Sequence, residues 1–178
     1  MASFALRTLG IGIACIVLGE PALSQPRTLE FRGLFIGGQT SPDRVMRTVG
    51  IPCREQFGET FVCRGTLSIN TIPVDTEFVV RQSVLQRIDM RFSSQEFDKV
   101  YSALKEGYGS PDNERLLPFD NGSAAQPRQQ QAVWMGPNGT QMYAVRFSSD
   151  AYHSAISYTT VSERASLRAM GLARGADL

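Results

Sequence analysis

The N-terminal segment of the chain decides which residues are left to fold. Arg7 is followed by an apolar run over residues 9–18, which has the length of a signal-peptide core and is too short to span a bilayer. Residues 22–24 (Ala-Leu-Ser) then give the small-x-small pattern that signal peptidase cleaves. We therefore expect residues 1–24 to be a cleavable signal peptide and the mature protein to be periplasmic or secreted.

Cys15 offers an alternative to this cleavage. The stretch from Gly12 to Cys15 (Gly-Ile-Ala-Cys) loosely resembles a lipobox, in which the cysteine is lipidated and becomes the new N-terminus. Gly12 is a poor residue for the apolar position, and the apolar run continues past Cys15. A lipoprotein anchored through Cys15 is therefore the secondary expectation, and under the favoured cleavage Cys15 leaves with the signal.

Two cysteines remain in the mature chain, and an even pair in an exported protein predicts a disulfide between Cys53 and Cys63. Closing this short loop stabilises the fold by about 3 kcal/mol in the chain-entropy model. A redox-active pair or a metal site is the alternative, but the chain has no Cys-x-x-Cys spacing and only one histidine. Residues 25–178 have the size of a single domain with its own core.

Charge and composition exclude several classes of partner. The formal net charge is +1, and basic and acidic residues are interspersed without runs. Neither nucleic acid nor an anionic membrane surface is therefore an expected partner. The glycine pair Gly37-Gly38 forms no phosphate-binding pattern, and the acids and amides after Pro111 lack the spacing of a calcium loop. We expect no cofactor, no metal ion and no transmembrane segment in the mature protein.

Hydrophobic periodicity predicts a mixture of helices and strands. Apolar residues at helical spacing, with serine caps before them and Gly-x-Pro after them, predict helices at about 42–49 and 94–108. Strands are predicted at 28–36, 59–69, 75–81, 84–92, 132–135, 141–147 and 155–161, before a short helix from Ser162. Residues 112–131 lack periodicity and are expected to be a long loop. The predicted fold class is α+β, an antiparallel sheet with helices packed on one side.

The two halves of the chain share one order of elements. Gly50 and Gly109 each end a predicted helix in a Gly-x-Pro sequence, and three predicted strands follow each helix. This order suggests two tandem helix-plus-three-strand modules, with half-repeats at 38–92 and 93–161. Capping alone also explains a glycine before a proline at the end of any helix, so both interpretations stay open.

The helix of the first half carries a family resemblance. Gly38-Gln39-Thr40, then Val45, then the run from Val49 to Pro52 (Val-Gly-Ile-Pro), resembles a signature of small exported modules. These are the outer-membrane assembly lipoproteins of the SmpA/OmlA type and the tandem modules of the β-lactamase inhibitor protein. Gln39 departs from the motif, and the second half lacks the Gly-x-Thr opening. The whole pattern also resembles small exported proteins of proteobacteria. Such families imply a non-catalytic module that binds another protein, and they transfer no site residues.

No residue pattern points to catalysis. His153 is the only histidine, and it lies in a polar stretch with no Gly-x-Ser-x-Gly elbow elsewhere in the chain. A surface or turn histidine is the interpretation we favour. Paired acids suffice for glycoside hydrolysis, but Glu55, Glu59, Glu77 and Asp89 have no spacing that marks one of them as an acid in an apolar pocket. We expect no catalytic residues, and an envelope hydrolase that uses His153 or a carboxylate pair is the alternative.

Trp134, Arg87 and Arg91 are the candidate partner contacts, because tryptophan and arginine dominate binding hot spots. The interpretation we favour is that Trp134 belongs to the sheet core and that the arginines are merely solvated, since large aromatic residues dominate cores as well as interfaces. The expected function is an exported, non-catalytic protein-binding module whose partner is another envelope or secreted protein. An inhibitor of a secreted enzyme is a further alternative that the resemblance invites.

Overall fold

The computed structural model describes residues 27–119 and 127–172. The expected signal peptide at 1–24, including Cys15, lies outside the described residues. The described elements are β1 (Glu30–Phe31), β2 (Leu34–Phe35), α1 (Pro42–Val49), β3 (Cys53–Glu55), β4 (Thr60–Ile69), β5 (Ile72–Arg81), β6 (Val84–Ser93), a 3₁₀ turn (Ser94–Glu96), α2 (Phe97–Tyr108), β7 (Asn113–Pro118), β8 (Arg128–Met135), a 3₁₀ turn (Pro137–Gly139), β9 (Gln141–Val145), β10 (His153–Thr159) and α3 (Val161–Ala169).

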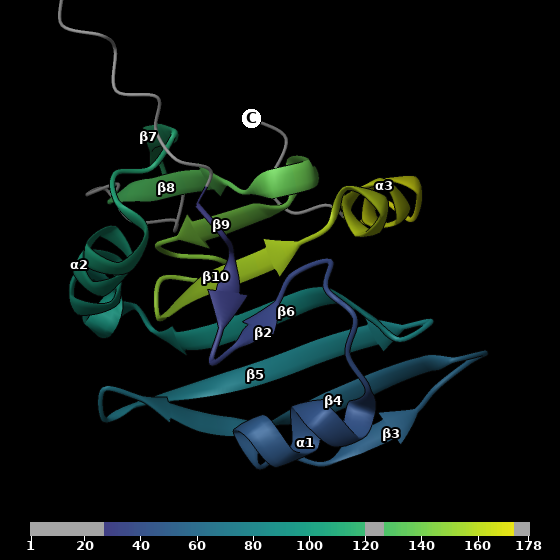
Figure 1. Ribbon diagram of the computed structural model, residues 1–178. Helices are drawn as coiled ribbons and strands as arrows, with labels where there is room; N and C mark the ends of the chain where they lie inside the picture. The colour runs from purple at the N-terminus through teal and green to yellow at the C-terminus, as the bar shows by residue number, and fades with distance from the viewer. Residues whose placement is uncertain (1–26, 120–126, 173–178) are drawn as a thin grey trace, which may run out of the picture.

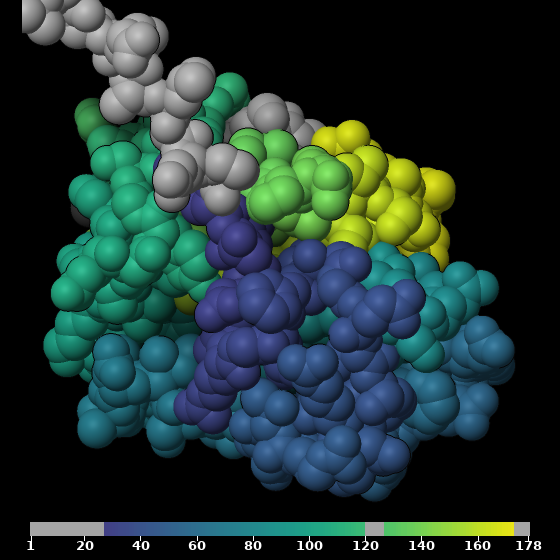
Figure 2. All heavy atoms as spheres, in the orientation of Figure 1, coloured from purple at the N-terminus to yellow at the C-terminus, as the bar shows by residue number. Residues whose placement is uncertain are grey.

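Eight of the strands form one antiparallel sheet in the order β3-β4-β5-β6-β10-β9-β8-β7. Helices α1 and α2 and the β1–β2 hairpin lie over one face of this sheet (Figure 1). The described N-terminal segment, coloured purple and containing β1 and β2, runs down the middle of that face between α2 and α1 (Figure 2). The α+β class predicted from the sequence is confirmed. α3 differs from the other two helices, because its residues border the opposite face of the sheet.

Helix α1 forms where the sequence predicts it. Ser41 caps its N-terminus by accepting a hydrogen bond from the backbone N–H of Arg44 at 3.2 Å. Gly50 ends it in the left-handed conformation with φ 75°, and the Gly50 N–H donates to the Met46 carbonyl. Val45 and Val49, one turn apart, are the residues of the helix that are buried against the sheet.

Helix α2 packs a longer apolar stripe on the second half of the sheet. A 3₁₀ turn precedes it, and the Ser93 side chain accepts a hydrogen bond from the Gln95 N–H there. The buried residues of the helix follow the predicted spacing of three, four and seven positions: Phe97, Val100, Tyr101 and Leu104. With α1, the hairpin and the inward side chains of the strands, they form one hydrophobic core.

The expected strand at 28–36 is a two-stranded hairpin instead. Its turn residues, Arg32 and Gly33, both have positive φ, at 51° and 75°. A two-residue hairpin turn of type I′ requires positive φ at both central positions, and glycine adopts it without strain. Leu34, directly after the turn, is buried in the core, so the segment still contributes the apolar cover that its composition predicts.

The expected loop at 112–131 contains strand β7 and the start of β8. These two strands pair over six residues, from Asn113 opposite Val133 to Pro118 opposite Arg128. β7 is the edge strand of the sheet, and nearly all its side chains are exposed. An edge strand of this kind has no buried face to produce an alternating sequence pattern, which explains why periodicity missed it. Residues 120–126 of the expected loop lie outside the described residues.

Each half of the described chain has one helix followed by four strands. α1 precedes β3 to β6, and α2 precedes β7 to β10. The last strands of the halves, β6 and β10, pair at the middle of the sheet, so that the strand order mirrors itself about this pair. The expected three strands per half omitted β3 and β7, which are the two outermost strands. Internal duplication of the sequence stays a prediction.

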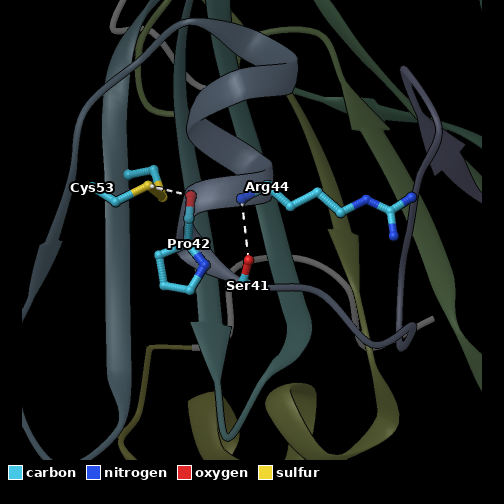
Figure 3. The surroundings of a disulfide bond; sticks show 5 residues. Ser41, Pro42, Arg44 and Cys53 are labelled. Atoms are coloured by element: carbon cyan, nitrogen blue, oxygen red, sulfur yellow. Dashed lines mark hydrogen bonds between the residues drawn. A yellow bond between two sulfur atoms is a disulfide. The ribbon is translucent and has the colours of Figure 1, made fainter.

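A disulfide links Cys53 on β3 to Cys63 on β4, as predicted from the sequence. The two residues lie directly opposite each other in the β3–β4 ladder. The sulfur of Cys53 lies 3.4 Å from the Pro42 carbonyl oxygen at the start of α1 (Figure 3). The disulfide therefore fixes the short edge strand directly beside the helix of the first half.

Replacing both cysteines by alanine is expected to lower the free energy of unfolding by about 3 kcal/mol, because the unfolded chain regains the entropy of an open loop. Urea unfolding followed by circular dichroism measures this difference. A reductant should lower the stability of the wild type by a similar amount and leave the double variant unchanged. A double variant as stable as the wild type would contradict the structural role of the disulfide.

Candidate functional site

The face of the sheet opposite α1 and α2 forms the floor of a hollow of about 840 Å³. Strands β4, β5, β6, β10, β9 and β8 supply its floor, and α3 borders it with Arg164, Leu167 and Arg168. We call this space the open hollow. Its volume lies within the usual range for ligand sites in proteins, about 300–1,000 Å³.

A row of charged side chains crosses the first half of the hollow. Arg64 on β4 pairs with Glu77 on β5 at 2.5 Å, and Arg87 on β6 pairs with the same carboxylate at 2.6 Å. Arg87 also pairs with Asp89 at 2.9 Å, and the Ser157 hydroxyl on β10 donates to Asp89 at 2.6 Å. β6 contributes two members of the row and β4, β5 and β10 contribute one each, because outward side chains of neighbouring strands lie side by side.

Burial and neighbouring charges of opposite sign act in opposite directions on the pKa values of Arg87 and Asp89. Burial lowers the pKa of Arg87, but the carboxylates of Asp89, Glu77 and Glu163 outweigh it, and the pKa is raised. Burial raises the pKa of Asp89, against the lowering effects of Arg87 and the Ser157 hydroxyl. The row is thus a self-neutralised network, whose charges are compensated within the protein.

Glu163 connects this network to helix α3. Its carboxylate is only 3% exposed and lies 3.1 Å from Arg81 and 3.5 Å from Arg87. Its backbone N–H also donates to the hydroxyl of Thr160, which caps the helix. A buried carboxylate requires compensating charge, so these arginines hold α3 at the border of the hollow.

The second half of the hollow has an apolar floor. Val133, Tyr143 and Val145 form a buried cluster separate from the main core, and Ala155 packs against it. Leu167 and Leu172 line the hollow from α3 and the residues after it. Burial raises the pKa of Tyr143 to about 12, so its hydroxyl is neutral at any physiological pH.

Two of the three predicted contact residues lie in the hollow. Arg87 and Arg91 line it from β6, and Arg91 extends to Asp150 at 3.1 Å with half of its side chain exposed. Trp134 does not line the hollow. It is fully buried in the main core, and its indole N–H donates to the Gly109 carbonyl at 2.9 Å. The hypothesis of Trp134 as a contact is therefore corrected: the folded domain leaves it no surface to offer to a partner.

His153 is the first residue of β10 and follows a turn that contains Asp150. Its Nδ1 atom is 2.8 Å from Asp150 Oδ1, and the same carboxylate accepts hydrogen bonds from the backbone N–H groups of Tyr152 and His153. The hydrogen bond of His153 is the first cause that lowers the pKa of Asp150 to about 2. The Ser148 hydroxyl donates to the His153 backbone carbonyl. Asp150 therefore stabilises this turn through its hydrogen bonds. None of these contacts activates a serine hydroxyl as a nucleophile.

The predicted carboxylates are divided between two places. Glu77 and Asp89 lie opposite each other on β5 and β6 inside the hollow, and both pair with Arg87. Glu55 and Glu59 lie at the sheet edge near the disulfide, and both are exposed. Within residues 27–119 and 127–172, no group of three or more histidine, cysteine or acidic residues could hold a metal ion.

Sequence reasoning missed Glu163, Tyr143 and Arg164 as residues of the site. Tyr143 had a visible signal, since it alternates with Val145 on a predicted strand face. That alternation could not tell which face is open, because every residue of β9 is buried. Glu163 has the sequence position of an ordinary capping residue, and only the fold brings the two arginines to it.

Comparisons of the chain with protein-family models, with curated proteins and with solved structures found no match. The residues of the open hollow therefore carry the functional argument.

Replacing Glu163 by glutamine is expected to lower the free energy of unfolding by about 2 kcal/mol, because the buried side chain loses its charge-assisted contacts with Arg81 and Arg87. Asp98→Asn is the matched control, because Asp98 pairs with Arg146 while 68% exposed, and its loss should cost about 1 kcal/mol or less. Urea unfolding of both variants measures the difference. Equal losses would contradict the anchoring role of Glu163.

Proposed function

We propose that the chain is an exported, non-catalytic module that binds another protein of the envelope or the extracellular space through the open hollow. The observation that carries the proposal is the asymmetry of the sheet. One face carries α1, α2 and the N-terminal hairpin, while the other is a hollow with charged and apolar halves. Protein interfaces likewise combine apolar surface with charged and polar groups.

Two sequence features support the exported location. The first 24 residues have the pattern of a cleavable signal peptide, and the Cys53–Cys63 disulfide suits an oxidising compartment. Among the described residues, none of the helices is long and apolar enough to cross a membrane. The lipoprotein alternative, with Cys15 as the lipidated N-terminus, would place the same module at a membrane surface.

The exposed arginines at the rim are the residues that a partner would meet first. Arg64 is 64% exposed and Arg91 is 49% exposed, although each pairs with an acid of the protein. Exposed ion pairs contribute little to stability, so these side chains can exchange partners at low energetic cost. Arginine in such a position is enriched among binding hot spots.

The double variant Arg64→Glu, Arg91→Glu is expected to lose a partner that the tagged wild-type mature protein captures from envelope and secreted fractions. Reversing both charges at the rim places acids against the partner's complementary surface, while the exposed positions leave the fold intact. Arg47→Glu, on the exposed surface of α1, is the matched control and should retain the partner. Mass spectrometry of the captured proteins reads the result. Capture of the same proteins by all variants, or of none by the wild type, would contradict the proposal.

One observation favours a hydrolase as the second candidate. Glu77 and Asp89 face each other in the hollow, and burial raises the pKa of Asp89, as a general acid requires. Arg87 pairs with both carboxylates, however, and its charge opposes the rise in the pKa of Asp89. We therefore keep the binding function as the proposal. Inhibition of a secreted enzyme is the form that binding would take if the captured partner is itself an enzyme.

Under the binding proposal, the wild type, Asp89→Asn and His153→Ala should all hydrolyse nitrophenyl esters and nitrophenyl glycosides no faster than buffer. The absorbance of released nitrophenol measures these rates, and circular dichroism checks that each variant is folded. A wild-type rate that either substitution abolishes would replace the binding proposal by the hydrolase.

A further inference from the structure

The apolar half of the open hollow has the properties of a small-molecule site. We call it the Tyr143 recess and define it by Tyr143, Val145 and Ala155 on the floor and by Leu167 and Leu172 at the α3 side. The floor cluster is separate from the main core, so these side chains do not serve to pack α1 or α2. Concave sites with apolar walls and a few polar groups are the usual sites for small ligands.

The Tyr143 hydroxyl is a polar group without a partner in this recess. The residue is 7% exposed and lines the hollow, yet its hydroxyl makes no hydrogen bond within the described part of the chain. Burial alone raises its pKa to about 12, with no contribution from a neighbouring charge or hydrogen bond. A hydroxyl that makes no hydrogen bond with the described protein residues can donate one to an acceptor atom of a ligand.

Arg164 adds a cation that forms no ion pair with an acid among the described residues. Its guanidinium donates to the Thr159 carbonyl and hydroxyl oxygens, both at 3.3 Å, and to the Gly139 carbonyl at 2.7 Å. Within the described residues it forms no ion pair, whereas Arg64, Arg87 and Arg91 in the same hollow all pair with carboxylates. Burial first, and then the charge of Arg168, lower the pKa of Arg164. The α3 side of the recess is therefore positive.

The two polar groups lie close enough to meet one ligand head group. Tyr143 is the cross-strand neighbour of Ser157, and Arg164 bonds to Thr159, two residues further along β10. Two residues of a strand span about 7 Å, which long tyrosine and arginine side chains can bridge. Asp89, the nearest acid on the floor, is compensated by Arg87 and by the Ser157 hydroxyl. Its charge therefore does not exclude an anion from the recess.

We propose that the Tyr143 recess binds a small amphiphile with a carboxylate head, whose apolar chain or ring lies on Val145 and Ala155. The Tyr143 hydroxyl donates a hydrogen bond to the carboxylate, and Arg164 supplies the opposite charge. Leu167 on α3 and Leu172 after it cover the apolar part from the other side. This site stands apart from the protein-binding proposal, because it requires no partner protein and uses the apolar half of the hollow.

Isothermal titration calorimetry with decanoate, decanol and decyltrimethylammonium, below their micelle concentrations, tests the ligand class on the wild-type mature protein. We expect saturable one-to-one binding of decanoate. Decanol should bind at least about tenfold more weakly, because hydrogen bonds to charged groups are the stronger ones. Absence of saturable decanoate binding, or equal binding of decanol or of the cation, would overturn the proposal.

Variants test the residues of the recess. Tyr143→Phe removes only the hydroxyl, and Arg164→Met keeps most of the apolar stem, and each should weaken decanoate binding about tenfold. Arg47→Gln on α1 is the control and should bind decanoate like the wild type. Binding unchanged by Tyr143→Phe would overturn the assignment of the head-group site, even if Arg164→Met proves unstable. When decanoate is added to the wild type, amide chemical-shift changes should lie on β8, β9, β10 and α3. Changes confined to α1 and α2 would also overturn the assignment of the head-group site.

The outcome of these titrations is separable from that of the capture experiment. Loss of decanoate binding in Tyr143→Phe with partner capture intact supports the recess and leaves the rim as the protein-binding surface. Partner capture without any decanoate binding overturns the recess alone. Decanoate binding without any captured protein overturns the protein-binding proposal alone.

Discussion

The pairing of β6 with β10 is the constraint on which the rest of the molecule depends. It joins the two halves of the chain into one sheet, with Asp89 opposite Ser157 and Arg87 opposite Thr159. Because side chains alternate between the faces of a strand, a shift of one residue would turn Arg87, Asp89 and Arg91 into the core. The observed register places all three on the open face, where carboxylates from β5 and α3 compensate Arg87.

This pairing gives the sheet two faces that differ in cover and composition. The covered face supplies stability through the main core, the caps of α1 and the disulfide beside it. The open face contributes the charged row and the Tyr143 recess, and α3 is held beside both through Glu163. A mutation on the covered face should therefore act on folding, while rim positions such as Arg91 can change without unfolding the domain. The separation lets one small domain keep a stable core while charged side chains such as Arg91 stay exposed on the open face.

The sequence predicts more of the fold than of the candidate site. Caps and apolar spacing located α1 and α2, because Ser41, Gly50 and the stripe from Phe97 to Leu104 act through local geometry. β7 escaped prediction because an exposed edge strand shows no apolar alternation. The site depends on long-range pairing: Arg87 and Glu163 are far apart in the chain and meet only when β6 lies beside β10. Trp134 is a candidate contact by residue type but lies in the core, because residue type alone cannot distinguish a hot spot from a core residue.

The central claim is that the open face, and not the helix-covered face, meets other molecules. Site-specific photocrosslinking in the living host tests it most directly, with a benzophenone amino acid at Arg91 in one strain and at Met46, exposed on α1, in another. The account predicts a discrete protein adduct from position 91 and none from position 46 after irradiation. An adduct from position 46 with none from position 91 would contradict it.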